Sequence, residues 1–207
     1  MSEGGFEATT IRSAYASVAD EYAATFVDDL AYLELDRRIL DVVADHSTGV
    51  GPVLDVGCGP AQVSGYLLGR QAEMVGIDFT PAMLAVARKR IPLLRVAIGD
   101  LRALPVRAGS VAGVVAYYVL QHVPRSELGR TFREVRRVLA HDGVFAAAFH
   151  QGDGEFQVGS VTATRYSAEE LSEQLANASL AVQTVGYRDP LPHEHQGDRC
   201  YLVARAT

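Results

Sequence analysis

The chain has 207 residues, of which 48% are hydrophobic, and a formal net charge of −6. This length and composition fit one domain with a sizeable core rather than two domains. The longest apolar run, from Val111 to Leu120, is interrupted by Gly113 and falls far short of the roughly 20 residues needed to cross a bilayer.

The charge is unevenly distributed. Residues 1–50 contain ten acidic residues and three arginines, a net charge of −7, and the rest of the chain is close to neutral. A nucleic-acid binder normally carries a basic surface that displaces counterions from phosphates. The one concentration of arginines, from Arg125 to Arg137, falls on an amphipathic helical pattern and is interpreted as a solvated helix face. We therefore expect neither a nucleic-acid nor a membrane partner.

The first residues lack the basic start and apolar run of a secretory signal, and two cysteines, Cys58 and Cys200, cannot form a disulfide framework. We therefore expect a cytoplasmic protein. Lys89 is the single lysine among 19 basic residues, a bias that indicates the codon usage of a GC-rich bacterium.

Short β-branched apolar runs alternate with helical patterns, which is typical of a parallel sheet with crossover helices. The runs predict strands at 52–56, 74–77, 93–98, 111–117, 143–149, 181–187 and 200–205. Helix starts are predicted at Thr80-Pro81 and at the capping box that begins at Ser167.

The patterns at 11–26 and 30–44 also predict helices, in front of the first strand. Tyr15 and Tyr22 are seven residues apart and therefore share one helix face. These helices form either a lid over the site or ordinary packing.

The most informative stretch is 53–61, Val-Leu-Asp-Val-Gly-Cys-Gly-Pro-Ala, an apolar strand that runs into a glycine-rich turn and then a helix at 62–68. Such a turn lets a ligand approach the backbone at the carboxyl end of the first strand. A dinucleotide site needs a small residue at position 62, which is Gln62 here. With Asp55 two residues before Gly57, the stretch instead resembles motif I of the class I S-adenosylmethionine-dependent methyltransferases.

Two further acids follow in order. Asp78 lies 19 residues beyond Gly59 at the end of the second strand, and Asp100 follows the third strand. The resemblance implies that Asp78 binds the ribose diol and that Asp100 or its neighbours receive the adenine amino group. It implies S-adenosylmethionine as cofactor, bound by Asp55, Gly57, Cys58, Gly59, Ala61, Asp78, Phe79, Met83, Asp100, Leu101, Tyr117, Tyr15 and Tyr22.

The resemblance covers residues 50–150 well, with departures. Ala61 replaces the usual third glycine but still permits close approach of the cofactor. Gly113 stands where many members have Asp, which leaves the support of the fourth strand open.

On the acceptor side, His122 and His150 fall at the carboxyl edge of the sheet and are the candidate catalytic bases, although a lone histidine is more often structural. Tyr117 or Tyr118 could face the sulfonium, and strand alternation predicts that at most one of them does. The candidate substrate contacts are Tyr118, Arg188, His193 and His195. The loop from His193 to His195 is interpreted as a substrate rim, with no metal expected.

The predicted fold is α/β, a three-layer Rossmann-like sandwich with a mostly parallel seven-stranded sheet whose last strand is antiparallel. One methyltransferase domain spans residues 1–207, with a helical lid at 1–48, the cofactor-binding core at 50–150 and a C-terminal helix and strand pair at 151–207. The expected function is methyl transfer to a small-molecule acceptor at O, N or C, by a monomer or homodimer. The alternatives are a cofactor-binding protein of this fold without methyl transfer, as a scaffold or a non-methylating catalyst, and a nicotinamide-dependent reductase, which Gln62 disfavours.

Overall fold

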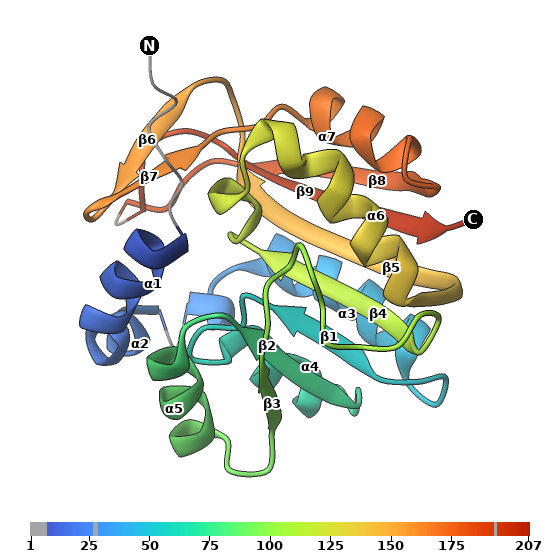
Figure 1. The fold of residues 1–207 in the computed structure, drawn as a ribbon, viewed down its shortest axis with the longest axis horizontal. Coiled ribbons are helices and arrows are strands. Elements are labelled where there is room, and N and C mark those ends of the chain that lie inside the picture. Colours follow the sequence, from blue (N-terminus) through green and yellow to red (C-terminus); the bar gives the residue numbers. More distant parts are fainter. Residues whose placement is uncertain (1–7, 27–28, 193) are drawn as a thin grey trace.

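The computed structural model describes residues 8–26, 29–192 and 194–207. Within them, one sheet of seven strands has the order β3-β2-β1-β4-β5-β9-β8 (Figure 1). Its strands, in chain order, are β1 (Val53–Val56), β2 (Met74–Asp78), β3 (Arg95–Ile98), β4 (Val111–Tyr117), β5 (Leu139–His150), β8 (Leu180–Arg188) and β9 (Arg199–Ala206).

Strand direction in the sheet agrees with the prediction. Neighbouring strands from β3 to β5 are parallel, whereas β9 runs antiparallel to β5 and to β8. The strand order reverses between β1 and β4, and the crevice at such a switch point is where open α/β sheets bind ligands. The predicted mostly parallel sheet with an antiparallel last strand is confirmed.

Helices cover both faces of the sheet, so the domain has three layers. Because strand side chains alternate, Val114 and Ala116 of β4 join one core and Val115 and Tyr117 join the other. The first core packs against α6 (Leu128–Val138) and α7 (Ala168–Ala176), and the second against α3 (Glu34–Ser47), α4 (Gln62–Gly69) and α5 (Pro81–Arg90).

The predicted helix starts are both found. The Ser167 hydroxyl accepts a hydrogen bond from the Glu170 amide at 3.1 Å, as a capping box requires. Helix α5 begins at Pro81 after Thr80, although the Thr80 side chain makes no capping hydrogen bond. Helix α6 buries Leu128, Phe132 and Val135, whereas Arg125 precedes it in a short 3-10 turn, η3 (Arg125–Glu127).

The N-terminal segment differs from the prediction of one continuous helix at 11–26. It forms two helices, α1 (Ala8–Ser17) and α2 (Ala19–Phe26), separated at Val18. The second predicted helix, at 30–44, begins later, because Asp29–Ala31 is a 3-10 turn (η1) and α3 starts at Glu34. The break at Val18 lets this segment turn against α5 and against β7 (Figure 1).

A hairpin that the sequence analysis did not predict follows β5. Its strands are β6 (Glu155–Val158) and β7 (Val161–Thr164), which pair with each other outside the main sheet. A short 3-10 turn, η2 (Leu120–His122), follows β4. Among the described helices, none combines the length and the apolar character of a membrane span.

Gly113 is closely packed between side chains of the neighbouring strands. A Cβ there would lie 3.2 Å from the Val53 side chain and 3.3 Å from the Val144 side chain, so an aspartate would not fit between these strands. The strand continues past it with a single register shift between Val111 and Gly113. Close packing around Gly113 therefore supports the fourth strand, β4, without an aspartate at this position.

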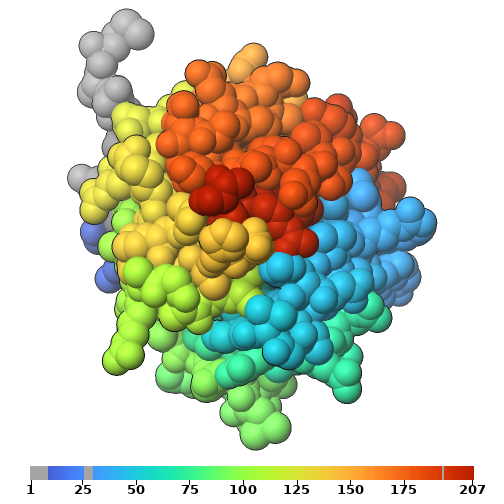
Figure 2. All heavy atoms as spheres, turned by 90° about the vertical axis from the view of Figure 1, so that its right-hand side faces the viewer, coloured from blue at the N-terminus to red at the C-terminus, as the bar shows by residue number. Residues whose placement is uncertain are grey.

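Strand β9 ends at the face opposite the carboxyl ends of the parallel strands, because it runs antiparallel to β5. In Figure 2 the C-terminal residues, in red, lie between the yellow segment around α6 and the cyan segment that precedes β1. The Arg136 guanidinium donates to the Thr207 carbonyl at 2.8 Å, and Arg205 donates to the Asp142 carbonyl at 3.2 Å.

Candidate functional site

A cavity of about 460 Å³ lies at the carboxyl ends of β1, β4 and β5, beside the start of β9. Helices α1 and α2, the start of α3 and the turn of the β6–β7 hairpin line it from the other side. Its volume falls within the range of about 300–1,000 Å³ that holds small molecules. Its lining includes the sequence-predicted residues Tyr15, Tyr22, Asp55, Gly57, Cys58, Gly59, Tyr117, Tyr118, His150 and His195.

The glycine turn after β1 forms one wall. Gly57, Gly59 and Ala61 have φ angles of 72°, 50° and 68°, a conformation that glycine adopts with little strain. A Cβ on Gly57 would lie 2.6 Å from Val119 Cγ2, whereas a Cβ on Gly59 would meet no atom within 4 Å. Gly57 therefore serves packing, and Gly59 leaves backbone open to the cavity, as a bound cofactor requires.

Asp55 joins the turn to the helix behind it. Its Oδ2 accepts hydrogen bonds from the Ser64 amide at 3.0 Å and the Ser64 hydroxyl at 2.6 Å. Burial raises the pKa of Asp55 to about 6, against the lowering effect of Ser64. Asp55 both fixes the first turn of α4 and lines the cavity.

Asp78 reaches the glycine turn from β2. Its Oδ2 accepts the Gly59 amide at 3.0 Å and its Oδ1 accepts the Thr80 amide at 2.7 Å. Burial raises the pKa of Asp78, against these backbone bonds. Asp78 lies outside the lining of the cavity, and its predicted binding of the ribose diol stays a prediction.

Cys58 is buried against Gly76 of β2. A Cβ on Gly76 would lie only 2.9 Å from the Cys58 sulfur, so a residue larger than glycine would not fit at position 76. Burial, with the charges of Asp55 and Asp78, raises the pKa of the Cys58 thiol. Cys58 is a packing residue of the turn rather than a nucleophile.

The predicted adenine-side residues lie outside the lining of this cavity. Asp100 accepts two side-chain hydrogen bonds from Arg102, at 2.9 and 2.6 Å, which with other favourable contacts lower its pKa although burial opposes them. Leu101 and Met83 are buried, and the Phe79 ring lies under the Arg12 guanidinium at 5.7 Å. Their assignment to the adenine remains a prediction.

Both tyrosines at the end of β4 line the cavity, Tyr117 as a buried residue of the core and Tyr118 as a half-buried one. That at most one of them faces the sulfonium stays a prediction. Tyr117 ends the strand, and Tyr118 has a φ of 56°, which breaks the alternation of side chains. The two rings lie 6.3 Å apart in an edge-to-face arrangement.

Tyr15 and His122 join the N-terminal helices to the sheet. The Tyr15 hydroxyl and His122 Nε2 are 2.8 Å apart, and the Tyr15 ring also contacts Tyr22 at 6.0 Å. Burial lowers the pKa of His122 to about 4 and raises that of Tyr15, so both groups are neutral near pH 7, and the ring tautomer decides which of them donates. His122 lies outside the cavity lining, behind Tyr15.

His150, at the end of β5, lines the cavity. Burial and the charge of Arg199 lower its pKa to about 3, so the imidazole is neutral near pH 7. Its ring contacts Tyr118 at 5.5 Å and Phe156 of the hairpin at 4.5 Å, and its Nδ1 has no partner among the described residues.

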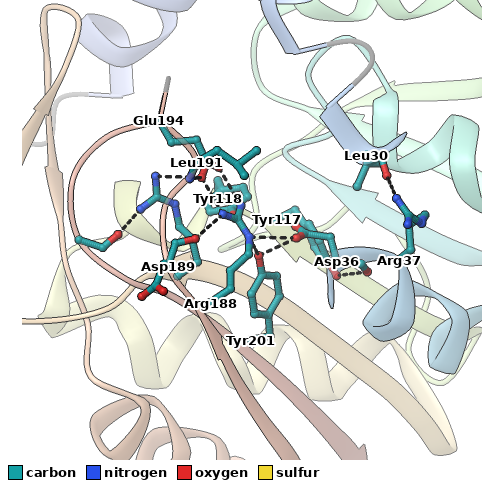
Figure 3. A network of polar contacts seen from close by, with 12 residues as sticks. Leu30, Asp36, Arg37, Tyr117, Tyr118, Arg188, Asp189, Leu191, Glu194 and Tyr201 are labelled. Atoms are coloured by element: carbon teal, nitrogen blue, oxygen red, sulfur yellow. Dashed lines mark hydrogen bonds and ion pairs between the residues drawn. The ribbon is translucent and has the colours of Figure 1, made fainter. Parts of the chain in front are cut away.

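Arg188 was predicted to contact substrate, but the structure places it behind the cavity wall. Figure 3 shows its guanidinium between Glu194 and Asp36, with Tyr201 below. It donates to both Glu194 oxygens at 2.6 and 2.7 Å, to the Tyr201 hydroxyl at 2.8 Å and to Asp36 Oδ2 at 3.3 Å. Arg188 therefore positions residues that line the cavity rather than lining it itself.

The segment after β8 contributes Glu194, His195 and, from β9, Arg199 to the lining. Burial alone would raise the pKa of Glu194, but Arg188, the Leu191 amide and Arg199 lower it to about 2. Arg199 is buried and donates to the His195 carbonyl at 2.8 Å. The predicted contact His193 lies outside the described residues, within which no three His, Cys, Asp or Glu side chains form a possible metal site.

Several polar residues of the cavity were not predicted from the sequence. The structure adds Asp36, Gln62, Gln121, Glu194 and Arg199 to its lining. Asp36 carried a usable signal, since it lies on the same face of α3 as Ile39, Leu40 and Val43, where an acid is unexpected. Within the described chain, four buried polar atoms of lining residues have no hydrogen-bond partner: Asp36 Oδ1, Gln62 Oε1, Gln121 Oε1 and His150 Nδ1.

Comparison with known proteins gives a consistent result. A family model described as a methyltransferase domain matches residues 53–143. The chain is 32% identical over 156 residues to a malonyl-[acyl-carrier protein] O-methyltransferase of Geobacter sulfurreducens, covering 71% of this chain and 55% of that protein. It is 39% identical over 74 residues to a trans-aconitate 2-methyltransferase of Methylobacterium radiotolerans, covering 34% of this chain and 28% of that one.

The chain spans 38%, 55% and 63% of the length of three curated relatives that it matches. Among solved structures, it resembles the 1,6-didemethyltoxoflavin-N1-methyltransferase of Burkholderia thailandensis with a TM-score of 0.77 and 19% identity. That match covers 100% of this chain and 92% of the other, which was solved with 1,6-didemethyltoxoflavin and S-adenosylhomocysteine. At this identity the likeness shows a common fold.

Proposed function

Because the chain belongs to the class I S-adenosylmethionine-dependent methyltransferase family, we propose that it transfers a methyl group to a small-molecule acceptor. The observation that carries the proposal is one cavity that joins the glycine turn after β1 to a polar wall at β5 and β9. The similar proteins named above as acting on malonyl-[acyl-carrier protein], trans-aconitate and didemethyltoxoflavin support this acceptor class.

S-adenosylmethionine supplies, when bound, a methyl group on a positively charged sulfur. The residues proposed to hold it are those of the glycine turn with Asp55 and Asp78, together with the predicted Phe79, Met83, Asp100 and Leu101. The open backbone at Gly59 and the unpartnered Gln62 Oε1 fit such a ligand. Tyr117, Tyr15 and Tyr22 offer aromatic faces to the cationic centre.

The protein's own contribution is mainly positioning. Alignment of reacting groups accounts for up to roughly 7–11 kcal/mol in intramolecular reactions. The lid helices, tied down by the contact of Tyr15 with His122, exclude water from the cavity. His150 and Tyr118 would contact the acceptor, and His195 would form its rim.

The runner-up is a protein of this fold that binds the cofactor without methyl transfer, as a scaffold or as a non-methylating catalyst. Intact Gly57, Gly59 and Asp78 support cofactor binding in both cases. The unpartnered polar atoms on the acceptor side favour the enzyme, because a scaffold has no need of them.

Calorimetry with S-adenosylmethionine, S-adenosylhomocysteine and NAD tests the cofactor. We expect the first two to bind and NAD not to, because Gln62 occupies the position where a dinucleotide site needs a small residue. Equal or tighter binding of NAD would reverse this assignment.

Transfer is tested by incubating the protein with S-adenosylmethionine and a small-molecule extract, then detecting methylated products by mass spectrometry. Cofactor binding without any product would favour the runner-up, and efficient methylation of bulk tRNA or DNA would refute the small-acceptor class. We propose a monomer or homodimer, which light scattering of the same sample tests.

A further inference from the structure

The acceptor end of the cavity presents unsatisfied hydrogen-bond acceptors. Asp36 Oδ1 and Gln121 Oε1 have no partner within the described chain, although their residues are only 1% and 3% exposed. His150 Nδ1 is also unpartnered on the same lining, and it is an acceptor in the tautomer that carries the proton on Nε2. Buried polar atoms are rarely left unpaired in a folded protein, so this wall is suited to a ligand that donates.

Asp36 is hydrogen-bonded to side chains of β8 and β9, which lie away from the glycine turn in the strand order of the sheet. Its Oδ2 accepts the Tyr201 hydroxyl at 2.7 Å and Arg188 Nε at 3.3 Å, as Figure 3 shows. Tyr201 belongs to β9 and Arg188 to β8, whereas the glycine turn follows β1. Asp36 therefore lies at the acceptor end of the cavity. Its Oδ2 accepts hydrogen bonds from Tyr201 and Arg188, and its Oδ1 has no partner within the described chain.

The nearby guanidinium groups are already engaged. Arg188 uses all three of its nitrogens on protein oxygens, including both oxygens of Glu194. Arg199 directs its two terminal nitrogens to the carbonyls of Gly197 and His195. The terminal nitrogens of both guanidinium groups thus serve protein oxygens, and a carboxylate entering this end would also meet the oxygens of Asp36 and Glu194.

From this arrangement we infer that the acceptor carries an N–H or O–H group, that Asp36 Oδ1 receives this group, and that acceptors offering a carboxylate there are disfavoured, in contrast to the malonyl and trans-aconitate acceptors for which two of the similar proteins are named. The inference rests on the proposed function and names its substrate class.

The proton balance of transfer follows. A lone pair of the acceptor nitrogen or oxygen forms the new bond to the methyl carbon, and the electron pair of the broken carbon–sulfur bond stays on sulfur. The proton of the N–H or O–H group passes to Asp36 Oδ1, which turns the carboxylate into the neutral acid. Asp36 is then a catalytic residue, because it contacts the reacting group.

The test uses two probes that share one ring and differ in the head group, benzylamine and benzoate. Both are titrated by ligand-observed NMR into the full-length protein saturated with S-adenosylhomocysteine. We expect benzylamine to bind at least about tenfold more tightly than benzoate, as one charge-assisted hydrogen bond would give.

Asp36→Asn sharpens the test. Arg188 offers only donors, so the amide oxygen of the new side chain should take the place of Oδ2 and its NH₂ group should face the cavity. The variant should lose the preference for benzylamine, with the ratio of the two dissociation constants shifted by about tenfold or more toward benzoate. The dissociation constant of S-adenosylhomocysteine should stay within about twofold, because Asp36 does not hold the cofactor.

Asp41→Asn is the matched control. Asp41 is on the same helix and is also bound by a tyrosine and an arginine, Tyr66 at 2.7 Å and Arg70 at 3.0 Å, but it lies outside the cavity lining. This variant should keep the wild-type preference. The comparison of benzylamine with benzoate on the wild-type protein needs no variant. It can therefore contradict the inference even if Asp36→Asn fails to fold.

Equal or tighter binding of benzoate, binding of neither probe, or an unchanged preference in a folded Asp36→Asn would overturn the inference. A loss of S-adenosylhomocysteine binding in Asp36→Asn alone would also overturn it, by placing Asp36 on the cofactor. If the wild type does not bind S-adenosylhomocysteine at all, the proposed function fails instead, so the two failures are distinguishable.

Discussion

The Tyr15 hydroxyl lies 2.8 Å from His122 Nε2, which joins the N-terminal helix α1 to the turn after β4. The two residues are 107 positions apart in the chain. This contact fixes α1 beside the cavity, which Tyr15 lines. It gives the proposed lid a specific bond whose removal can be measured.

Tyr15→Phe should weaken cofactor retention. It removes one hydrogen bond of about 1 kcal/mol, so S-adenosylhomocysteine should bind about fivefold less tightly, with little change in melting temperature. Calorimetry measures the dissociation constant. Tyr32→Phe is the control, since Tyr32 is 79% exposed. If both variants bind S-adenosylhomocysteine with the same dissociation constant, the bond between Tyr15 and His122 does not contribute to cofactor retention.

Deletion of residues 1–25 should impair turnover and cofactor retention more than it impairs the core fold, because lids of this kind exclude water and complete the site. Melting curves and S-adenosylhomocysteine titrations of the truncated protein measure the two effects. A truncated protein that melts normally and holds the cofactor as tightly as the full chain would make these helices ordinary packing.

Gly57→Ala and Gly59→Ala should separate stability from binding. Gly57→Ala brings a methyl group to 2.6 Å from Val119 at a φ of 72°, and should destabilise the fold by about 2–5 kcal/mol. Gly59→Ala meets no atom within 4 Å, so it should cost only the backbone strain of about 1–2 kcal/mol and mainly weaken cofactor binding. Urea denaturation and calorimetry test this, and equal stability losses would contradict it.

Asp78→Ala should weaken cofactor binding without unfolding the protein. Charge-assisted hydrogen bonds are each worth about 1.5–3 kcal/mol, and the variant also frees the Gly59 amide that Asp78 accepts. Calorimetry with S-adenosylmethionine, beside circular dichroism, measures the effect, and the exposed Asp153→Ala serves as the control. An unchanged dissociation constant in a normally folded variant would remove Asp78 from the cofactor site.

His122 should make the fold sensitive to acid. Burial lowers its pKa from 6.5 to about 4, so between these values the unfolded chain holds a proton that the folded chain does not. Stability contributed by His122 is therefore present above pH 6.5 and is lost as the pH falls toward 4, by at most about 3 kcal/mol.

The raised pKa of Asp55, about 6, acts in the opposite direction, so the wild-type profile alone is not decisive. His122→Gln isolates the effect, because its amide oxygen can still accept from Tyr15. Urea denaturation between pH 7 and pH 4.5 should show a smaller loss of stability in the variant. Parallel profiles for the two proteins would contradict the assignment.

The sequence by itself determined the sheet and the place of the cofactor turn. Strands and their alternation are local patterns, and the glycines after β1 with Asp55 and Asp78 follow from where parallel strands end. The helix break at Val18 and the β6–β7 hairpin were missed, because neither depends on a strong local signal and both form against the rest of the domain. Tyr118 lies just past β4 with a positive φ that no residue pattern indicated, and the structure brings it to the cavity beside Tyr117.

The tertiary structure alone decided the acceptor wall. Arg188 and Tyr201 are 152 and 165 residues away from Asp36, so no spacing in the sequence could connect them. Asp36 lies on the apolar face of α3, and only the folded chain shows that a half-buried arginine and a buried tyrosine hold one of its oxygens and leave the other unpartnered. The physical reason is that desolvating a carboxylate is tolerable only where such partners converge, and convergence is a property of the packed molecule.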